Sequence, residues 1–107
     1  MQTLKIMFTR GDHATQPGGL ILRYDETRDQ YVTHRFNRTA HTRTPREFYW
    51  GHYFLEDNGP NARDKAYADY NSRRAKCLQY EITEAELIAK GDVGFSPSGI
   101  WEGNVDA

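Results

Sequence analysis

The fold is decided by two aromatic runs, Tyr31-Val32-Thr33-His34-Arg35-Phe36-Asn37 and Phe48-Tyr49-Trp50-Gly51-His52-Tyr53-Phe54. Both runs are rich in the β-branched and aromatic residues that are typical of strands. The segment between them contains arginines and no acidic residue until Glu47. We therefore expect a β-hairpin with a basic end, and we call residues 35–46 the arginine tip.

The length and composition favour a single domain with a thin core. A chain of 107 residues has room for one core only. We expect this domain to span residues 1–107, with residues 92–107 forming either an extended arm or a frayed tail. Hydrophobic residues make up 37% of the chain, so seven Tyr, five Phe and two Trp are expected to supply much of the core volume.

The charge distribution excludes two classes of protein. A net charge of −1 fits neither a strongly basic nucleic-acid coat nor a strongly acidic mimic of DNA. Residues 34–46 hold four arginines and no acid, whereas residues 81–107 hold six acids and one lysine. We expect a molecule with a basic tip and an acidic C-terminal portion.

The single cysteine and the distribution of apolar residues indicate the cellular compartment of the protein. Cys77 has no partner for an intramolecular disulfide, which fits a reducing environment. The first eight residues lack the features of a signal peptide, and no apolar run approaches the ~18–20 residues of a membrane span. We therefore expect a cytoplasmic protein without membrane contacts.

The hydrophobic periodicity predicts four strands, at residues 3–9, 19–24, 30–38 and 46–55. Consecutive strands with short connections usually pair, so these should form an antiparallel meander. Residues 78–82 are a short alternating run that predicts a fifth strand or an extended return.

A main helix is predicted at residues 62–77, with Asn61 as its N-cap. Its sheet-facing stripe is expected to comprise Ala66, Tyr67, Tyr70, Arg74 and Cys77. The capping-box pattern from Thr83 to Glu86 predicts a short helix that Gly91 ends. The expected fold class is α+β, an antiparallel four- to five-stranded sheet with one main helix on one face and a short C-terminal helix.

The two histidines of the hairpin are the first candidate site. If Phe36 lies opposite Phe48, then His34 and His52 become diagonal neighbours on one face. Together with Asp12, His13 or Glu47 they could ligate a metal, or one could act as a general base. The chain has no recognised metal-ligand spacing, so the alternative is that each histidine packs on aromatic rings, and we expect no metal site.

The arginine tip and the aromatic residues of the second run are the second candidate site. The predicted binding residues are Arg35, Arg38, Arg43, Arg46, Tyr49, Trp50 and Tyr53. Tyr, Trp and Arg are the residue types that contribute most to protein interfaces. Arginine also binds phosphate, and aromatic rings stack on unpaired bases, so a nucleic-acid interface stays open as the alternative.

No catalytic signature accompanies these surfaces. Cys77 lies near the end of a predicted helix, where a thiol pKa is not lowered. Ser96 and Ser98 do not form a nucleophile elbow, and the glycines at 11, 18 and 19 do not have the spacing of a phosphate loop. We therefore expect a protein that is not an enzyme and holds no cofactor.

The aromatic hairpin runs, the segment Ala66-Tyr67-Ala68-Asp69-Tyr70 and Arg73 give the chain a resemblance to the short accessory proteins of phages and plasmids. The resemblance covers about the middle half of the chain. Small inhibitors of CRISPR systems are similar in size and α+β build. The resemblance implies a protein-binding factor of a mobile genetic element that inhibits or modulates a host or defence complex, such as a CRISPR effector.

Two alternatives to this function stay open. One is a nucleic-acid-binding module that uses the arginine tip. The other is a small metal-dependent enzyme that uses His34 and His52. In each case the partner and the oligomeric state are undetermined by the sequence.

Overall fold

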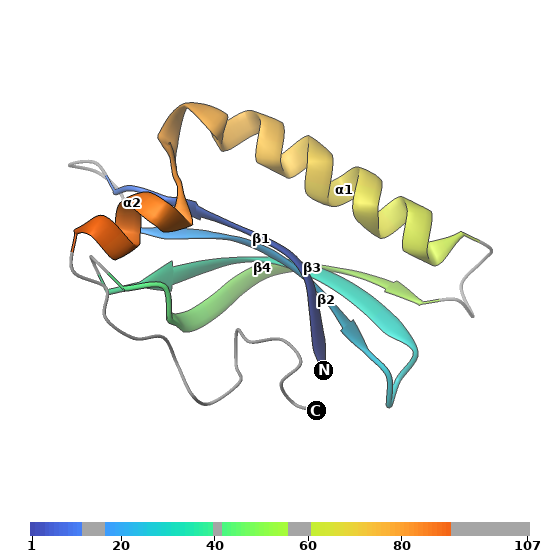
Figure 1. The fold of residues 1–107 in the computed structure, drawn as a ribbon. Coiled ribbons are helices and arrows are strands. Elements are labelled where there is room, and N and C mark those ends of the chain that lie inside the picture. Colours follow the sequence, from blue (N-terminus) through green and yellow to red (C-terminus); the bar gives the residue numbers. More distant parts are fainter. Residues whose placement is uncertain (12–16, 40–41, 56–60, 91–107) are drawn as a thin grey trace.

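The computed structural model describes residues 1–11, 17–39, 42–55 and 61–90. Its elements follow the chain in the order β1 Gln2–Thr9, β2 Gly18–Asp25, β3 Gln30–Arg38, β4 Pro45–Leu55, α1 Ala62–Cys77, the 3₁₀ turn η2 Leu78–Tyr80, β5 Glu81–Ile82 and α2 Glu84–Ala89 (Figure 1). The predicted α+β class, the four strands, the main helix and the short C-terminal helix are confirmed.

The described strands form one five-stranded antiparallel sheet in the order β4-β3-β2-β1-β5. The first four strands make the expected meander, because each is joined to its neighbour along the chain. The short β5 pairs with β1, placing Ile82 opposite Phe8. Strand β4 therefore lies at one edge of this sheet.

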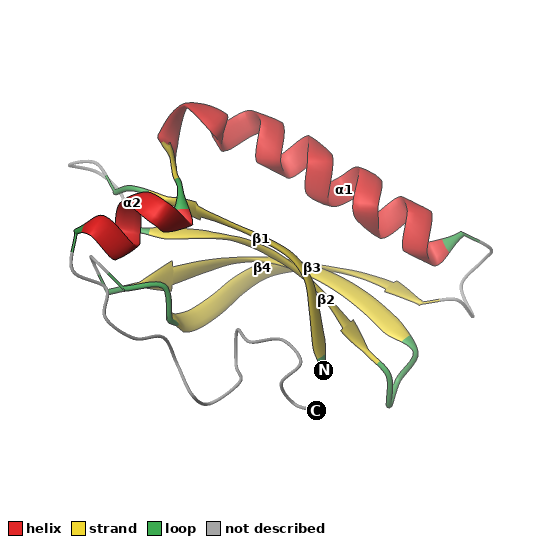
Figure 2. Cartoon of the chain, in the orientation of Figure 1, coloured by secondary structure: helices red, strands yellow, loops and turns green. Residues whose placement is uncertain are grey.

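Helix α1 covers one face of the sheet (Figure 2). Met7, Leu20 and Leu22 of the strands pack there, and the helix contributes its buried residues. The residues of the predicted stripe lie on this side, with Ala66, Tyr70 and Cys77 buried and Tyr67 and Arg74 half-buried. Spacings of three and four residues along α1 thus produce one apolar face, as predicted.

A second core cluster lies on the opposite face. Successive strand residues point to opposite sides, so Phe8 and Ile21 face away from α1. They pack with Phe36, Ile82 and Leu87. Because Leu87 belongs to α2, the short C-terminal helix covers this second face beside β1 and β5.

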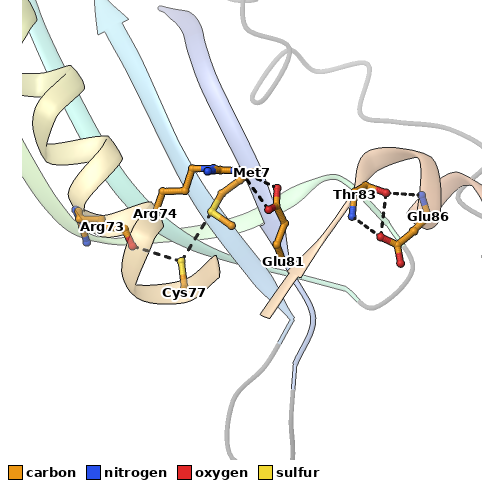
Figure 3. Close-up of polar contacts among 7 residues, drawn as sticks. All are labelled: Met7, Arg73, Arg74, Cys77, Glu81, Thr83 and Glu86. Atoms are coloured by element: carbon orange, nitrogen blue, oxygen red, sulfur yellow. Dashed lines mark hydrogen bonds and ion pairs between the residues drawn. The ribbon is translucent and has the colours of Figure 1, made fainter. Parts of the chain in front are cut away.

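The turn after α1 is held by several side-chain contacts (Figure 3). The Cys77 thiol lies 3.8 Å from the Met7 sulfur, and Arg74 forms an ion pair with Glu81 at 3.2 Å. The predicted capping box is present, with the Thr83 hydroxyl accepting from the Glu86 backbone N–H. Hydrogen bonds from Thr83 lower the pKa of Glu86.

Asn61 occupies the predicted N-cap position of α1, with φ 69°, but its side chain makes no capping hydrogen bond. None of the helices within the described ranges is long and apolar enough to cross a bilayer. Asp12, His13, Gly91 and the predicted arm at 92–107 lie outside the described residues.

Candidate functional site

The outer strand β4 exposes two large aromatic side chains. Trp50 is 70% exposed and Tyr53 is 57% exposed. The Tyr49 ring meets the Trp50 ring edge-on, with 5.1 Å between their centroids. Three of the predicted binding residues therefore lie together on β4, at an edge of the described sheet.

A β-bulge interrupts β4 at Trp50 and Gly51. Thr33 pairs with His52 and Arg35 pairs with Tyr49, so two residues of β4 face the single residue His34. Trp50 adopts φ 53°, a left-handed conformation that is strained for a side chain of this size. A Cβ at Gly51 would lie 2.6 Å from Nε2 of His34 and 2.8 Å from the Tyr53 hydroxyl, so a side chain at this position would have to displace one of these rings.

This bulge separates the two histidines that were expected to share a face. The predicted pairing of Phe36 with Phe48 is confirmed, but beyond the bulge His52 lies opposite Thr33 and Tyr53 lies opposite Val32. One extra residue reverses the alternation of side chains, so His34 and His52 point to opposite faces. The prediction of a diagonal histidine pair is wrong for this reason.

His34 is packed among aromatic rings on the face opposite α1. It is 9% exposed, its Nε2 lies 3.2 Å from the Tyr53 hydroxyl, and its ring centroid lies 5.5 Å from that of Phe48. Burial, followed by the charges of Arg23 and Arg73, lowers the pKa of His34 to about 4. His34 is therefore neutral at physiological pH. Its contacts with the Phe48 ring and the Tyr53 hydroxyl are those of the packing alternative.

His52 belongs instead to a polar network under α1. Its Nδ1 lies 3.0 Å from Oδ2 of Asp69, which also accepts a 2.5 Å hydrogen bond from the Thr33 hydroxyl. Arg73 donates to Oγ1 of Thr33 at 3.1 Å. Asp69 thus fixes the orientation of the His52 ring and directs its Nε2 away from the carboxylate.

This network continues to Arg35, which lies on the same face of the sheet beside Thr33. Arg35 is half-buried, and its Nε is buried without a hydrogen-bond partner among the described residues. Burial is the main effect that lowers the pKa of Arg73; Asp69 opposes it, and the nearby charge of Arg35 adds to it. We call Thr33, Arg35, His52, Asp69 and Arg73 the helix-side cluster.

The helix-side cluster does not have the composition of a metal site. Within residues 1–11, 17–39, 42–55 and 61–90, no three His, Cys, Asp or Glu side chains are grouped closely enough to bind a metal. Glu47, one of the ligands considered with the histidines, accepts a 2.9 Å hydrogen bond from Asn37.

Arg38 is a structural residue rather than an exposed part of the arginine tip. It is 4% exposed, and its guanidinium donates to the carbonyl oxygens of Gly18, Thr9 and Thr42 at 3.0, 2.7 and 3.0 Å. The expectation that Arg38 contacts a partner is corrected, because these bonds hold β1, β2 and the end of β3 together.

The other arginines of the tip also differ from one another. Arg43 forms a 2.6 Å ion pair with Glu84 of α2, and its side chain is 14% exposed. Arg46 is exposed on β4, whereas Arg35 faces α1. The structure therefore does not bring the four arginines together into one basic surface.

A pocket of about 180 Å³ lies beside α2 and the end of β3. It is lined by Arg10, Gly11, Pro17, Arg38, Ile82, Leu87 and Lys90. Arg10 donates to the Gln79 carbonyl, and Arg38 makes the bonds described above. Both guanidinium groups in this pocket thus serve the fold.

The sequence analysis missed four residues that contribute to these sites: Thr33, Gly51, Asp69 and Arg73. A glycine inside a strand pattern is a recognised sign of a bulge, so Gly51 carried a usable signal. Asp69 and Arg73 are four residues apart and therefore share a helix face, but their contacts with Thr33 link elements far apart in the sequence.

The chain matches no protein-family model, no curated protein and no solved structure. Function is therefore inferred from the exposed edge of β4 and from the chemistry of the helix-side cluster.

Proposed function

We propose that this protein is a non-enzymatic binding protein whose partner protein docks on the edge strand β4. The observation that supports this most directly is the exposure of Trp50 and Tyr53 on the same strand. Large exposed aromatic residues are favoured anchors of protein interfaces, because they bury much area at a small entropic cost.

The position of β4 adds a second reason. A strand at the edge of a sheet presents backbone N–H and C=O groups that another strand can pair with. Within the described residues β4 pairs only with β3, and it is 11 residues long. The strained φ of Trp50 further supports a role in binding, since such strain is concentrated at functional sites.

The class of partner follows from the resemblance to phage and plasmid accessory proteins. The first partners to test are host or defence complexes, such as CRISPR effectors, in the cytoplasm of the host. The buried free thiol of Cys77 is compatible with that reducing compartment. Of the four predicted arginines, Arg46 is the best candidate to contact the partner, because it is exposed on β4.

The test compares capture of partners by the wild-type protein and by the double variant Trp50→Ser/Tyr53→Ser. We expect a partner that is recovered with the wild-type protein to be lost with the double variant. The control is Ile88→Ser, because Ile88 is 50% exposed on α2, away from β4. Retention of the partner by a folded double variant, or its loss from the Ile88 control alone, would overturn the proposal.

A further inference from the structure

We propose that the helix-side cluster binds a phosphate group, with Arg35 and Arg73 as its cationic ligands and His52 at its exposed side. This site lies beneath α1, on the face of β3 that also carries Thr33. It borders β4, which contributes His52, but it does not include the exposed Trp50 and Tyr53 of the proposed partner surface. It therefore adds a second binding activity to the protein.

The first support is the electrostatic balance of the cluster. Arg73 donates to the Thr33 hydroxyl, and Arg35 lies on the same face of β3 two residues from Thr33. The charge of Arg35 accordingly acts on Arg73. Asp69 is the carboxylate within the cluster, and it already accepts hydrogen bonds from Thr33 and His52. Positive charge is thus in excess, and a second anion would balance it.

The second support is the hydrogen-bonding capacity that the fold leaves at Arg35. The buried Nε of Arg35 has no partner among the described residues, and such a group is costly unless it is satisfied. A guanidinium presents its donors as a planar fork that matches two oxygens of a phosphate. A phosphate oxygen would supply the acceptor that the surrounding side chains do not.

The third support is the placement of His52. Asp69 holds Nδ1 of the ring, and the His52 side chain is half exposed, so Nε2 is the ring nitrogen that Asp69 does not hold. Arg35 and His52 lie on the same face of the hairpin, opposite Tyr49 and Thr33 respectively. A phosphate held by Arg35 would therefore lie beside the imidazole.

The test is a titration with inorganic phosphate, and in a separate arm with a short oligothymidylate, followed by NMR of the arginine Nε–H and histidine ring signals. We expect saturable shifts at Arg35, Arg73 and His52. Arg35→Gln should weaken binding about tenfold or more, because a charged hydrogen bond is removed. Arg46→Gln, at an exposed arginine outside the cluster, should change binding less than about twofold.

The two arms identify the source of the phosphate. Binding of inorganic phosphate alone indicates a small ligand, whereas tighter, salt-dependent binding of the oligothymidylate indicates a nucleic-acid backbone. Either result supports the site if it depends on Arg35. The absence of saturable shifts, or shifts that persist in a folded Arg35→Gln variant, would overturn it and leave the proposal for β4 untouched.

Discussion

Strands β3 and β4 belong to one hairpin and both carry aromatic residues, but β3 is largely buried and β4 is largely exposed. In β3 the residues Val32, Thr33, Phe36 and Arg38 are buried, because β2 and β4 flank this strand on its two sides. In β4 the residues Trp50 and Tyr53 are exposed. The difference has two causes. The strand β3 lies inside the sheet and β4 lies at its edge, and β4 contains one extra residue at the bulge. As a result, β3 supports the fold and β4 is available for binding.

The largest expected effect tests the structural role of β3. Replacing Arg38 by alanine should lower the free energy of unfolding by about 3 kcal/mol or more, because three carbonyl oxygens lose a charged donor. Urea denaturation measures this change. Arg46→Ala on β4 is the matched control and should change it by less than about 0.5 kcal/mol. Equal effects of the two substitutions would contradict the distinction between the strands.

The second prediction tests the bulge that separates the strands. Gly51→Ala should cost about 1–3 kcal/mol, because the new methyl group overlaps the buried ring of His34. In a His34→Ala background the same substitution should cost clearly less, since that ring is absent. A double-mutant cycle measured by denaturation gives this coupling, and a coupling near zero would show that the bulge tolerates a side chain.

The third prediction concerns pH and the histidine of β3. The pKa of His34 is about 4, below its ordinary value of 6.5, so between these values the unfolded chain takes up a proton that the folded protein does not. Its contribution to stability is complete above pH 6.5 and is lost as the pH falls toward 4, by up to about 3 kcal/mol. His34→Gln should remove this part of the pH dependence. An NMR titration that gives His34 an ordinary pKa near 6.5 would contradict this explanation of the pH dependence.

The smallest effect concerns the exposed strand. Trp50→Gly should leave the free energy of unfolding unchanged or raise it by up to about 1 kcal/mol, because glycine adopts a positive φ without strain. Trp50→Val should lower it by about 1 kcal/mol, since a β-branched residue is poorly suited to that conformation. Both variants lose the exposed ring, so the difference between their thermal denaturation temperatures reports the backbone effect. A valine variant more stable than the glycine variant would contradict the prediction.

Much of the fold was predictable from local patterns. Period-two alternation located β1 to β4, and the spacing of Ala66, Tyr70 and Cys77 identified the buried face of α1. The capping box at Thr83 was predictable because both of its partners lie within one turn of the chain.

The candidate sites were less predictable, because they depend on register and on contacts between distant segments. Strict alternation along β3 and β4 predicted that His34 and His52 share one face of the sheet. The bulge at Gly51 instead places them on opposite faces. The same alternation puts Arg38 on the face of Phe36, which was a usable sign of its burial. The contact of Asp69 with Thr33 spans 36 residues and has no local signature.

The pairing of β5 with β1 has a consequence for folding during synthesis. Ile82 lies opposite Phe8, and Leu87 completes the cluster that contains Ile21 and Phe36. A growing chain therefore produces the whole β1–β4 meander before the residues that cover its second face emerge from the ribosome. Contacts of such long sequence separation form late and slow folding, so this nascent sheet is the species most exposed to aggregation and to chaperones.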